Sequence, residues 1–165
     1  MIRTHNISFS YKEYEKSEEL DPDDFRLISE ARKAALNAYA PYSKFKVGAA
    51  VRLTSGKIVR AANVENAAFP SGICAERSAL SNSVSNYPDD KITALALAAL
   101  TNDVLTENPP SPCGNCRQVI AEEESKTGKK IKIILSGKNK THIIDGIGSL
   151  LPLQFNGDNL RINLP

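Results

Sequence analysis

The chain has 165 residues, of which 41% are hydrophobic and 24% charged, with 21 basic and 19 acidic side chains. This composition is that of a globular protein long enough for one domain with its own core. The nearly balanced charge lacks the basic excess of a nucleic-acid binder, and no apolar run is long enough to span a bilayer. Residues 1–10 lack the apolar core of a signal peptide, and an odd number of cysteines argues against a disulfide framework. We therefore expect a cytoplasmic protein without nucleic-acid or membrane partners.

The first half of the chain predicts an arm, a helix and a hairpin. Residues 1–20 are polar and charged and fit either an edge strand or a loose arm, so we separate them as an N-terminal arm from a domain over residues 21–165. A helix is predicted from Asp21 as its cap and Pro22 as its first residue. The apolar residues at helical spacing that support this helix are Phe25, Ile28, Ala31, Ala35 and Ala38, and Ala40-Pro41 ends the run. Two strands over residues 45–53 and 57–62 flank a turn with Gly56.

The second half predicts two more helices and three strands. One helix is expected from Cys74 to about Ser85, and another from Ser111, as its cap, to about Lys126. Residues 92–100 are nearly all apolar, which is typical of a strand buried on both faces at a sheet centre. Two short strands are expected at residues 131–135 and 142–144. Their connection is too short for a parallel crossover, so they are predicted to pair as an antiparallel hairpin. The tail, residues 147–165, is predicted as a short helical turn and loop, and the whole as one α/β domain.

The three cysteines carry the strongest functional signal. Cys74 belongs to a C-x-E element, and Cys113 and Cys116 to a P-C-x-x-C element. Cys113 and Cys116 lie three residues apart at a predicted helix start, which places both sulfurs on one face. Helix N-termini also stabilise thiolates. The pattern predicts one Zn²⁺ per chain, held by three cysteines, with a fourth position open for water.

Two neighbours of Cys74 have predicted roles. Glu76 is not expected to bind the metal but to carry protons between bound water and a substrate, as in a hydrolytic attack on an amidine-like carbon. Three thiolates leave the zinc site with net negative charge, which weakens the metal as a Lewis acid. Arg77 is therefore predicted to donate hydrogen bonds to one or two sulfurs.

Other interpretations of these residues remain open at this point. A structural zinc site needs a fourth protein ligand, and neither His5 nor His142 has ligand spacing to a cysteine. A redox pair of Cys113 and Cys116 leaves Cys74 and its neighbouring glutamate without a role. The other interpretation of Arg77 is a surface cation on a helix.

Four motifs resemble cytidine deaminase. They are APYSKFKVGAA at residues 40–50, NVENAA at 63–68, CAER at 74–77 and SPCGNCRQ at 111–118. LLPLQF at residues 150–155 resembles the C-terminal segment of the small homotetrameric branch, whose zinc has three cysteine ligands. The resemblance covers residues 22–160 in the family's order.

The resemblance implies both a fold and a reaction. The fold is a three-layer α/β/α arrangement around a mixed five-stranded sheet. The reaction is the hydrolytic deamination of free cytidine and deoxycytidine to uridine and deoxyuridine in pyrimidine salvage, by zinc-bound hydroxide with Glu76 as proton shuttle. The partners that it implies are a small nucleoside and three further copies of the chain, in a homotetramer.

By matching position, the resemblance also assigns nucleoside contacts. Phe45 would stack near the pyrimidine, and Asn63 and Glu65 would hydrogen-bond the ribose hydroxyls. Backbone around Ala75 and Ser111 would read the base edge. Phe155 would reach into the site of a neighbouring subunit. Without the resemblance, Phe45 and Phe155 would be interpreted as core aromatics, and Asn63 and Glu65 as turn residues.

The sequence leaves three alternative functions open. The first is deamination of a related aminopyrimidine nucleoside or nucleoside antibiotic. In this respect Phe69 is relevant, because the family often has tyrosine there. The second is polynucleotide editing, which the balanced charge and the short connection between residues 135 and 142 disfavour. The third is a zinc-stabilised interaction module without catalytic activity.

Overall fold

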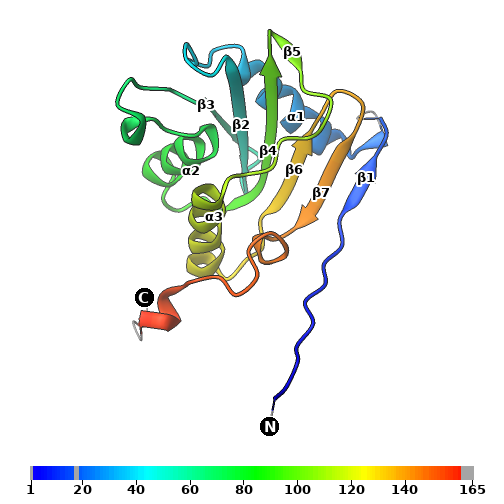
Figure 1. Ribbon diagram of the computed structural model, residues 1–165, viewed down its shortest axis with the longest axis vertical. Helices are drawn as coiled ribbons and strands as arrows, with labels where there is room; N and C mark the ends of the chain where they lie inside the picture. Colours follow the sequence, from blue (N-terminus) through cyan, green and yellow to red (C-terminus); the bar gives the residue numbers. More distant parts are fainter. Residues whose placement is uncertain (1, 17–18, 161–165) are drawn as a thin grey trace.

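The structure is a computed structural model that describes residues 2–16 and 19–160, and its centre is a mixed β-sheet with helices on both faces (Figure 1). Its five main strands lie in the order β3 (Ile58–Ala62), β2 (Phe45–Leu53), β4 (Ile92–Thr101), β6 (Lys132–Ser136) and β7 (Thr141–Asp145). Strands β4 and β6 pair in parallel, whereas β6 and β7 form the predicted antiparallel hairpin.

The sheet is larger than the five strands predicted. Strand β1 (Lys12–Tyr14) adds to the outer edge of β7, and β5 (Val104–Leu105) pairs with β4. Strand β5 was not predicted from the sequence, because a strand of only two residues has no recognisable pattern. It follows β4 through a tight turn in which Asn102 and Asp103 both adopt left-handed conformations. Residues 12–14 are thus an edge strand, whereas residues 2–11 are exposed and extend away from the body (Figure 1). The division between arm and domain at residue 20 stays a prediction.

Helix α1 (Pro22–Ala35) begins as predicted but ends early. The Asp21 carboxylate accepts a hydrogen bond of 3.0 Å from the Asp23 backbone N–H, which caps the helix. The predicted end at residues 40–41 is wrong, because the chain must leave the helix sooner for Tyr39 to form a bridge with Val64. This bridge joins the segment before β2 to the segment before α2.

Helices α2 (Ala75–Asn86) and α3 (Gly114–Thr127) cover the other face of the sheet (Figure 1). The N-cap of α2 is Cys74, and the N-cap of α3 is Cys113. The predicted cap of α3 at Ser111 is wrong: the backbone stays extended through Cys113 (φ −67°, ψ 167°) before the helix starts. No helix in the described ranges is both long and apolar enough to cross a membrane.

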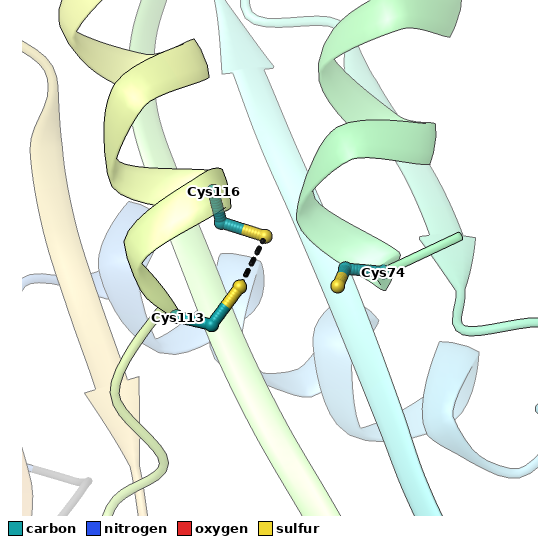
Figure 2. Close-up of side chains that lie close together, drawn as sticks. All are labelled: Cys74, Cys113 and Cys116. Carbon is teal, nitrogen blue, oxygen red and sulfur yellow. Dashed lines mark hydrogen bonds between the residues drawn. The ribbon is translucent and has the colours of Figure 1, made fainter. Parts of the chain in front are cut away.

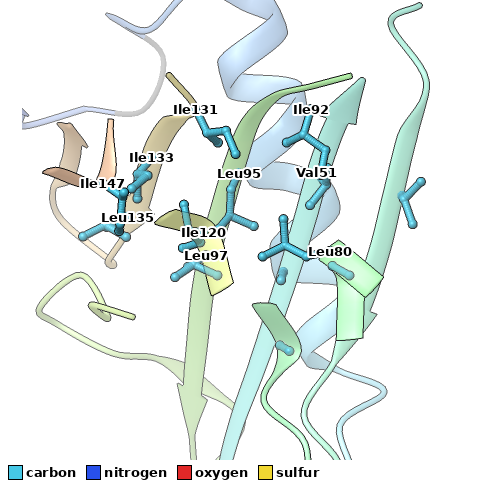
Figure 3. Packing of buried hydrophobic residues seen from close by; sticks show 14 of the residues in the cluster. Val51, Leu80, Ile92, Leu95, Leu97, Ile120, Ile131, Ile133, Leu135 and Ile147 are labelled. Carbon is cyan, nitrogen blue, oxygen red and sulfur yellow. The ribbon is translucent and has the colours of Figure 1, made fainter. Parts of the chain in front are cut away.

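Two apolar cores hold these layers together. The core under α2 and α3 is rich in large side chains, among them Leu80, Leu95 and Ile120 (Figure 3). In the core under α1 the central strand contributes only small side chains, because β4 presents Ala94, Ala96 and Ala98 to that helix. Both faces of β4 are therefore buried, which confirms its predicted place at the sheet centre.

Short 3₁₀ turns complete the described chain. Turn η2 (Phe69–Ser71) lies between β3 and α2, and η3 (Ile147–Ser149) and η4 (Gly157–Leu160) follow β7. Turns η3 and η4 agree with the helical turn and loop expected for the tail. The predicted tail also includes residues 161–165, which lie outside the described residues.

Candidate active site

The three cysteines converge at the starts of two helices (Figure 2). Their sulfur atoms all lie within 4.8 Å of one another, and the sulfurs of Cys113 and Cys116 are 3.5 Å apart. Cys74 approaches them from the N-cap of α2. All three are free thiols, and Cys116 is buried while Cys113 is exposed. The fold thus brings together the three ligands predicted from the sequence.

This donor set fits a tetrahedral metal ion. Zinc binds thiolate sulfur at about 2.3 Å, which places neighbouring sulfurs about 3.8 Å apart. The distance between Cys113 and Cys116 is close to this value, and the other two sulfur–sulfur distances exceed it by no more than about 1 Å, so a zinc ion fits between the three sulfurs after small side-chain movements. Among the described residues, no histidine, carboxylate or further cysteine joins the cluster as a fourth ligand. His142 instead lies on β7, where its Nε2 is 2.6 Å from the Glu13 carboxylate. Three protein donors with a free fourth position are typical of a catalytic site.

The surroundings of the thiols differ from one cysteine to the next. Burial raises the pKa of the Cys74 thiol, and burial together with the nearby Glu76 carboxylate raises the pKa of Cys116. Burial also acts on Cys113, but hydrogen bonds from the Cys116 and Asn115 backbone N–H groups outweigh it and lower the pKa of that thiol. A metal ion must therefore displace protons from at least the two less acidic thiols when it binds.

Glu76 lies beside the cluster in the first turn of α2. Its side chain is buried, with 6% of the residue exposed. This burial raises the pKa of the carboxyl group, although its own backbone N–H and the Cys116 thiol donate hydrogen bonds that oppose the shift. A carboxyl group that keeps its proton to a higher pH than an exposed glutamate is suited to passing protons to and from a reactant.

Two arginines, Arg77 and Arg117, are close to the cysteines in sequence, and they differ in their hydrogen bonds. Arg117 Nε donates to the Pro112 carbonyl at 2.8 Å, and its Nη1 donates to the Leu150 carbonyl at 2.7 Å. It therefore anchors the chain just before Cys113, a role that the sequence did not suggest. Arg77 is half-buried, and no hydrogen bond from it reaches a sulfur in the described structure. Its predicted role as a donor to the thiolates stays a prediction.

The cluster opens into a cavity of about 440 Å³. Among its lining residues are most of those predicted to bind the nucleoside or to react: Phe45, Asn63, Glu65, Cys74, Ala75, Glu76, Ser111 and Cys113. Phe69 also lines the cavity, with 77% of the residue exposed. Its ring meets the Tyr42 ring edge to face, with centroids 6.2 Å apart.

Hydrogen bonds fix one wall of this cavity. Asn63 Oδ1 accepts from the Val47 backbone N–H at 2.7 Å, and Asn63 Nδ2 donates to the Phe45 carbonyl at 3.1 Å. The amide therefore has one N–H left to donate. Glu65 Oε2 accepts from the Tyr42 and Ser43 backbone N–H groups, at 2.9 Å and 3.3 Å. An amide donor and a carboxylate acceptor thus belong to the same wall, a pair that matches a hydroxyl group.

Phe155 is not among the residues that line this cavity. It is 56% exposed, and its backbone carbonyl accepts a hydrogen bond of 2.9 Å from Gln118 on α3. The ring therefore lies on the outside of its own chain. Its predicted place in a neighbouring subunit's site stays a prediction.

Three thiols at two helix starts, a buried carboxylate beside them and a cavity in front of both define a metal-dependent hydrolytic enzyme. Residues 22–131 match the family model described as the cytidine and deoxycytidylate deaminase zinc-binding region. The chain belongs to this family.

Individual relatives agree with this assignment. A cytidine deaminase of Sporosarcina psychrophila is 47% identical over 97 residues, which are 59% of this chain and 67% of that protein. One from Mycobacterium tuberculosis is 34% identical over 140 residues, 85% of this chain and 95% of that protein. The crystal structure of cytidine deaminase from Burkholderia pseudomallei superposes with a TM-score of 0.67 at 35% identity, covering 79% of this chain and 97% of that chain. The expected fold class is confirmed.

Proposed function

We propose that this protein deaminates free cytidine and deoxycytidine to uridine and deoxyuridine with release of ammonia, a reaction of pyrimidine salvage. The observation that carries the proposal is the convergence of the three cysteines and buried Glu76 on one cavity. The relatives named cytidine deaminase support the same reaction.

Zinc is the metal we propose for the three cysteines. When bound, it supplies a Lewis acid that makes water a nucleophile at neutral pH. The part of Glu76 is to carry two protons from the attacking water: one goes to the ring nitrogen, which keeps it in the product, and one goes to the amine, which leaves as ammonia. Its burial beside the thiols and its absence from the metal cluster support this role.

The cavity wall orients the nucleoside in this proposal. Phe45 stacks on the pyrimidine, and the backbone at Ala75 and Ser111 reads the base edge. A sugar hydroxyl accepts from the free N–H of Asn63 and donates to Glu65, because the other polar atoms of these groups are engaged with the backbone.

Ultraviolet absorbance tests the proposed reaction directly. Purified protein is expected to contain about one zinc per chain and to convert cytidine to uridine. A strong chelator should abolish turnover, and added zinc should restore it. Turnover that persists after complete zinc removal would contradict the proposed chemistry. A panel of other aminopyrimidine nucleosides in the same assay tests the alternative substrates. These substrates are included because Phe69, where the family often has tyrosine, lines the cavity.

The proposal also includes a homotetramer in the cytoplasm. Apolar side chains are exposed near the cavity and on the C-terminal segment, among them Phe69, Leu153 and Phe155. Such residues are commonly covered by other subunits. Free thiols at the metal site suit a reducing compartment. Sedimentation equilibrium is expected to give about four times the 17.9 kDa mass of one chain, and a monomer at assay concentration would contradict the shared site.

A further inference from the structure

Arg117 lies in the first turn of α3, one residue after Cys116, and its side chain bonds to two separate parts of the chain. Its Nε donates to the Pro112 carbonyl at 2.8 Å, and its Nη1 donates to the Leu150 carbonyl at 2.7 Å. Both donors belong to one rigid, planar guanidinium group. The peptide that precedes Cys113 and the segment that follows η3 are therefore held together at the start of α3.

Arg117 holds the carbonyl groups on both sides of the Cys113 Cα atom. Its side chain binds the Pro112 carbonyl, and its backbone N–H donates to the Cys113 carbonyl at 2.9 Å. With both carbonyls held, the Cys113 backbone stays extended at ψ 167°. Because a rotation in ψ swings the Cβ atom relative to the helix that follows, this value directs the Cys113 sulfur. That sulfur lies 3.5 Å from the sulfur of Cys116 (Figure 2).

The local sequence also permits a different backbone at Cys113. Ser111 is a favourable cap and Pro112 a favourable first helical residue, so a helix could begin earlier than α3 does. Cys113 would then adopt a helical ψ of about −42°, and its sulfur would point elsewhere. In that longer helix the Pro112 carbonyl would accept from the Cys116 backbone N–H. Arg117 opposes the change because its Nε already holds this carbonyl.

The Leu150 carbonyl keeps the Arg117 side chain in place. Leu150 and Leu151 pack against the core under α2 and α3, and the backbone N–H groups of both donate to the Ile147 carbonyl, at 2.8 Å and 3.0 Å. The Leu150 carbonyl therefore has a fixed position. The guanidinium group cannot turn away from Pro112 without straining or losing this second bond.

We infer that Arg117 is a positioning residue for metal binding: braced by the Leu150 carbonyl, it holds Cys113 in the backbone conformation that directs its sulfur into the cluster. The inference rests on the proposed zinc site. A cluster with one misdirected sulfur must be reordered when the ion binds, so the loss of Arg117 weakens metal affinity. Arg117 does not line the cavity, and its loss therefore leaves nucleoside contacts in place.

The test measures metal binding without turnover. Metal-free protein is titrated with Co²⁺, whose absorption bands report thiolate coordination, and then with Zn²⁺ in competition with a chelator. Arg117→Gln, which is too short to reach both carbonyls, is expected to weaken the affinity for both ions about ten- to hundredfold. Arg117→Lys can bond to one carbonyl at a time and should lose about three- to tenfold. Arg26→Gln replaces an exposed arginine on α1 and should match wild type.

Thermal unfolding separates positioning from general damage. A residue that only stabilises the fold lowers the melting temperature equally with and without metal and leaves the metal affinity unchanged. For Arg117→Gln we expect the stabilisation gained from bound metal to be smaller than in wild type, by about 1.4 kcal/mol for each tenfold loss of affinity. Unchanged affinity overturns the inference, whether or not the melting temperature falls. If Arg117→Gln does not fold without metal, Arg117→Lys provides the same comparison.

Failure of the inference is separable from failure of the proposed function. Wild-type protein that binds neither ion tightly refutes the proposed zinc site and the inference with it. A wild type that binds zinc and converts cytidine, beside an Arg117→Gln variant of equal metal affinity, refutes the role of Arg117 alone. When saturated with zinc, Arg117→Gln is expected to keep its KM for cytidine within about twofold of wild type.

Discussion

Replacing Glu76 by glutamine is expected to lower kcat for cytidine by about 10²- to 10⁴-fold while the zinc content stays at one per chain. Glutamine keeps the size of the side chain and its place in the first turn of α2, but it cannot accept and return a proton. The carboxylate is separate from the three thiols that form the metal cluster, so the metal should remain. Activity and metal analysis of the same preparation provide the measurement.

The matched control for this substitution is Glu122→Gln. Glu122 is an exposed glutamate on α3 that does not line the cavity, so kcat should stay within about twofold of wild type. Undiminished turnover of Glu76→Gln with full zinc would remove Glu76 from the mechanism. Loss of zinc along with activity would instead show that the carboxylate holds the metal site together.

Gly48→Ala is expected to cause the largest loss of stability among glycine-to-alanine substitutions at the eight glycines whose surroundings the structure describes. A Cβ atom at Gly48 would lie 2.1 Å from the Ala31 carbonyl oxygen and 2.3 Å from the Ala35 backbone nitrogen. These are backbone atoms of α1, which cannot rotate away as a side chain would. We expect the free energy of unfolding to fall by about 3 kcal/mol, which lowers the melting temperature by roughly 6–12 °C.

Thermal and urea unfolding measure this effect, and Gly148→Ala is the comparison. A Cβ atom at Gly148 would meet no atom within 4 Å, so its melting temperature should match wild type. Equal stability of the two variants would show that α1 can shift on the sheet. Helix α1 packs close to β2 at Gly48 because the neighbouring strand β4 presents only small side chains to the helix, namely Ala94, Ala96 and Ala98.

Patterns that are local in sequence predicted their part of the structure well. The run at residues 45–53 coincides with β2, and the apolar run at 92–100 lies within the central strand β4. The spacing of Cys113 and Cys116 placed both on one helix start, and the fold adds Cys74. Each of these depends on periodicity or capping within a few residues.

What the sequence did not predict depends on contacts between distant segments. Ser111 and Pro112 resemble a helix start, but Arg117 holds the Pro112 carbonyl in extended backbone, and Cys113 becomes the cap. The Ser43 backbone N–H donates a hydrogen bond to the Glu65 carboxylate, 22 residues away in the sequence, which no local pattern reveals. The need for glycine at position 48 likewise arises only when α1 packs on β2. An isolated glycine inside a strand pattern was the one available signal for that close approach.

The two helix starts that supply the cysteines belong to segments separated along the chain by the whole of β4. An ion bound to Cys74 on one side and to Cys113 and Cys116 on the other therefore acts as a cross-link between α2 and α3, above the core that both helices cover. Its binding free energy adds to the stability of the folded state. We therefore expect that removing the metal lowers the melting temperature of the protein as well as its turnover, because the same ion joins the two helices and takes part in the proposed reaction.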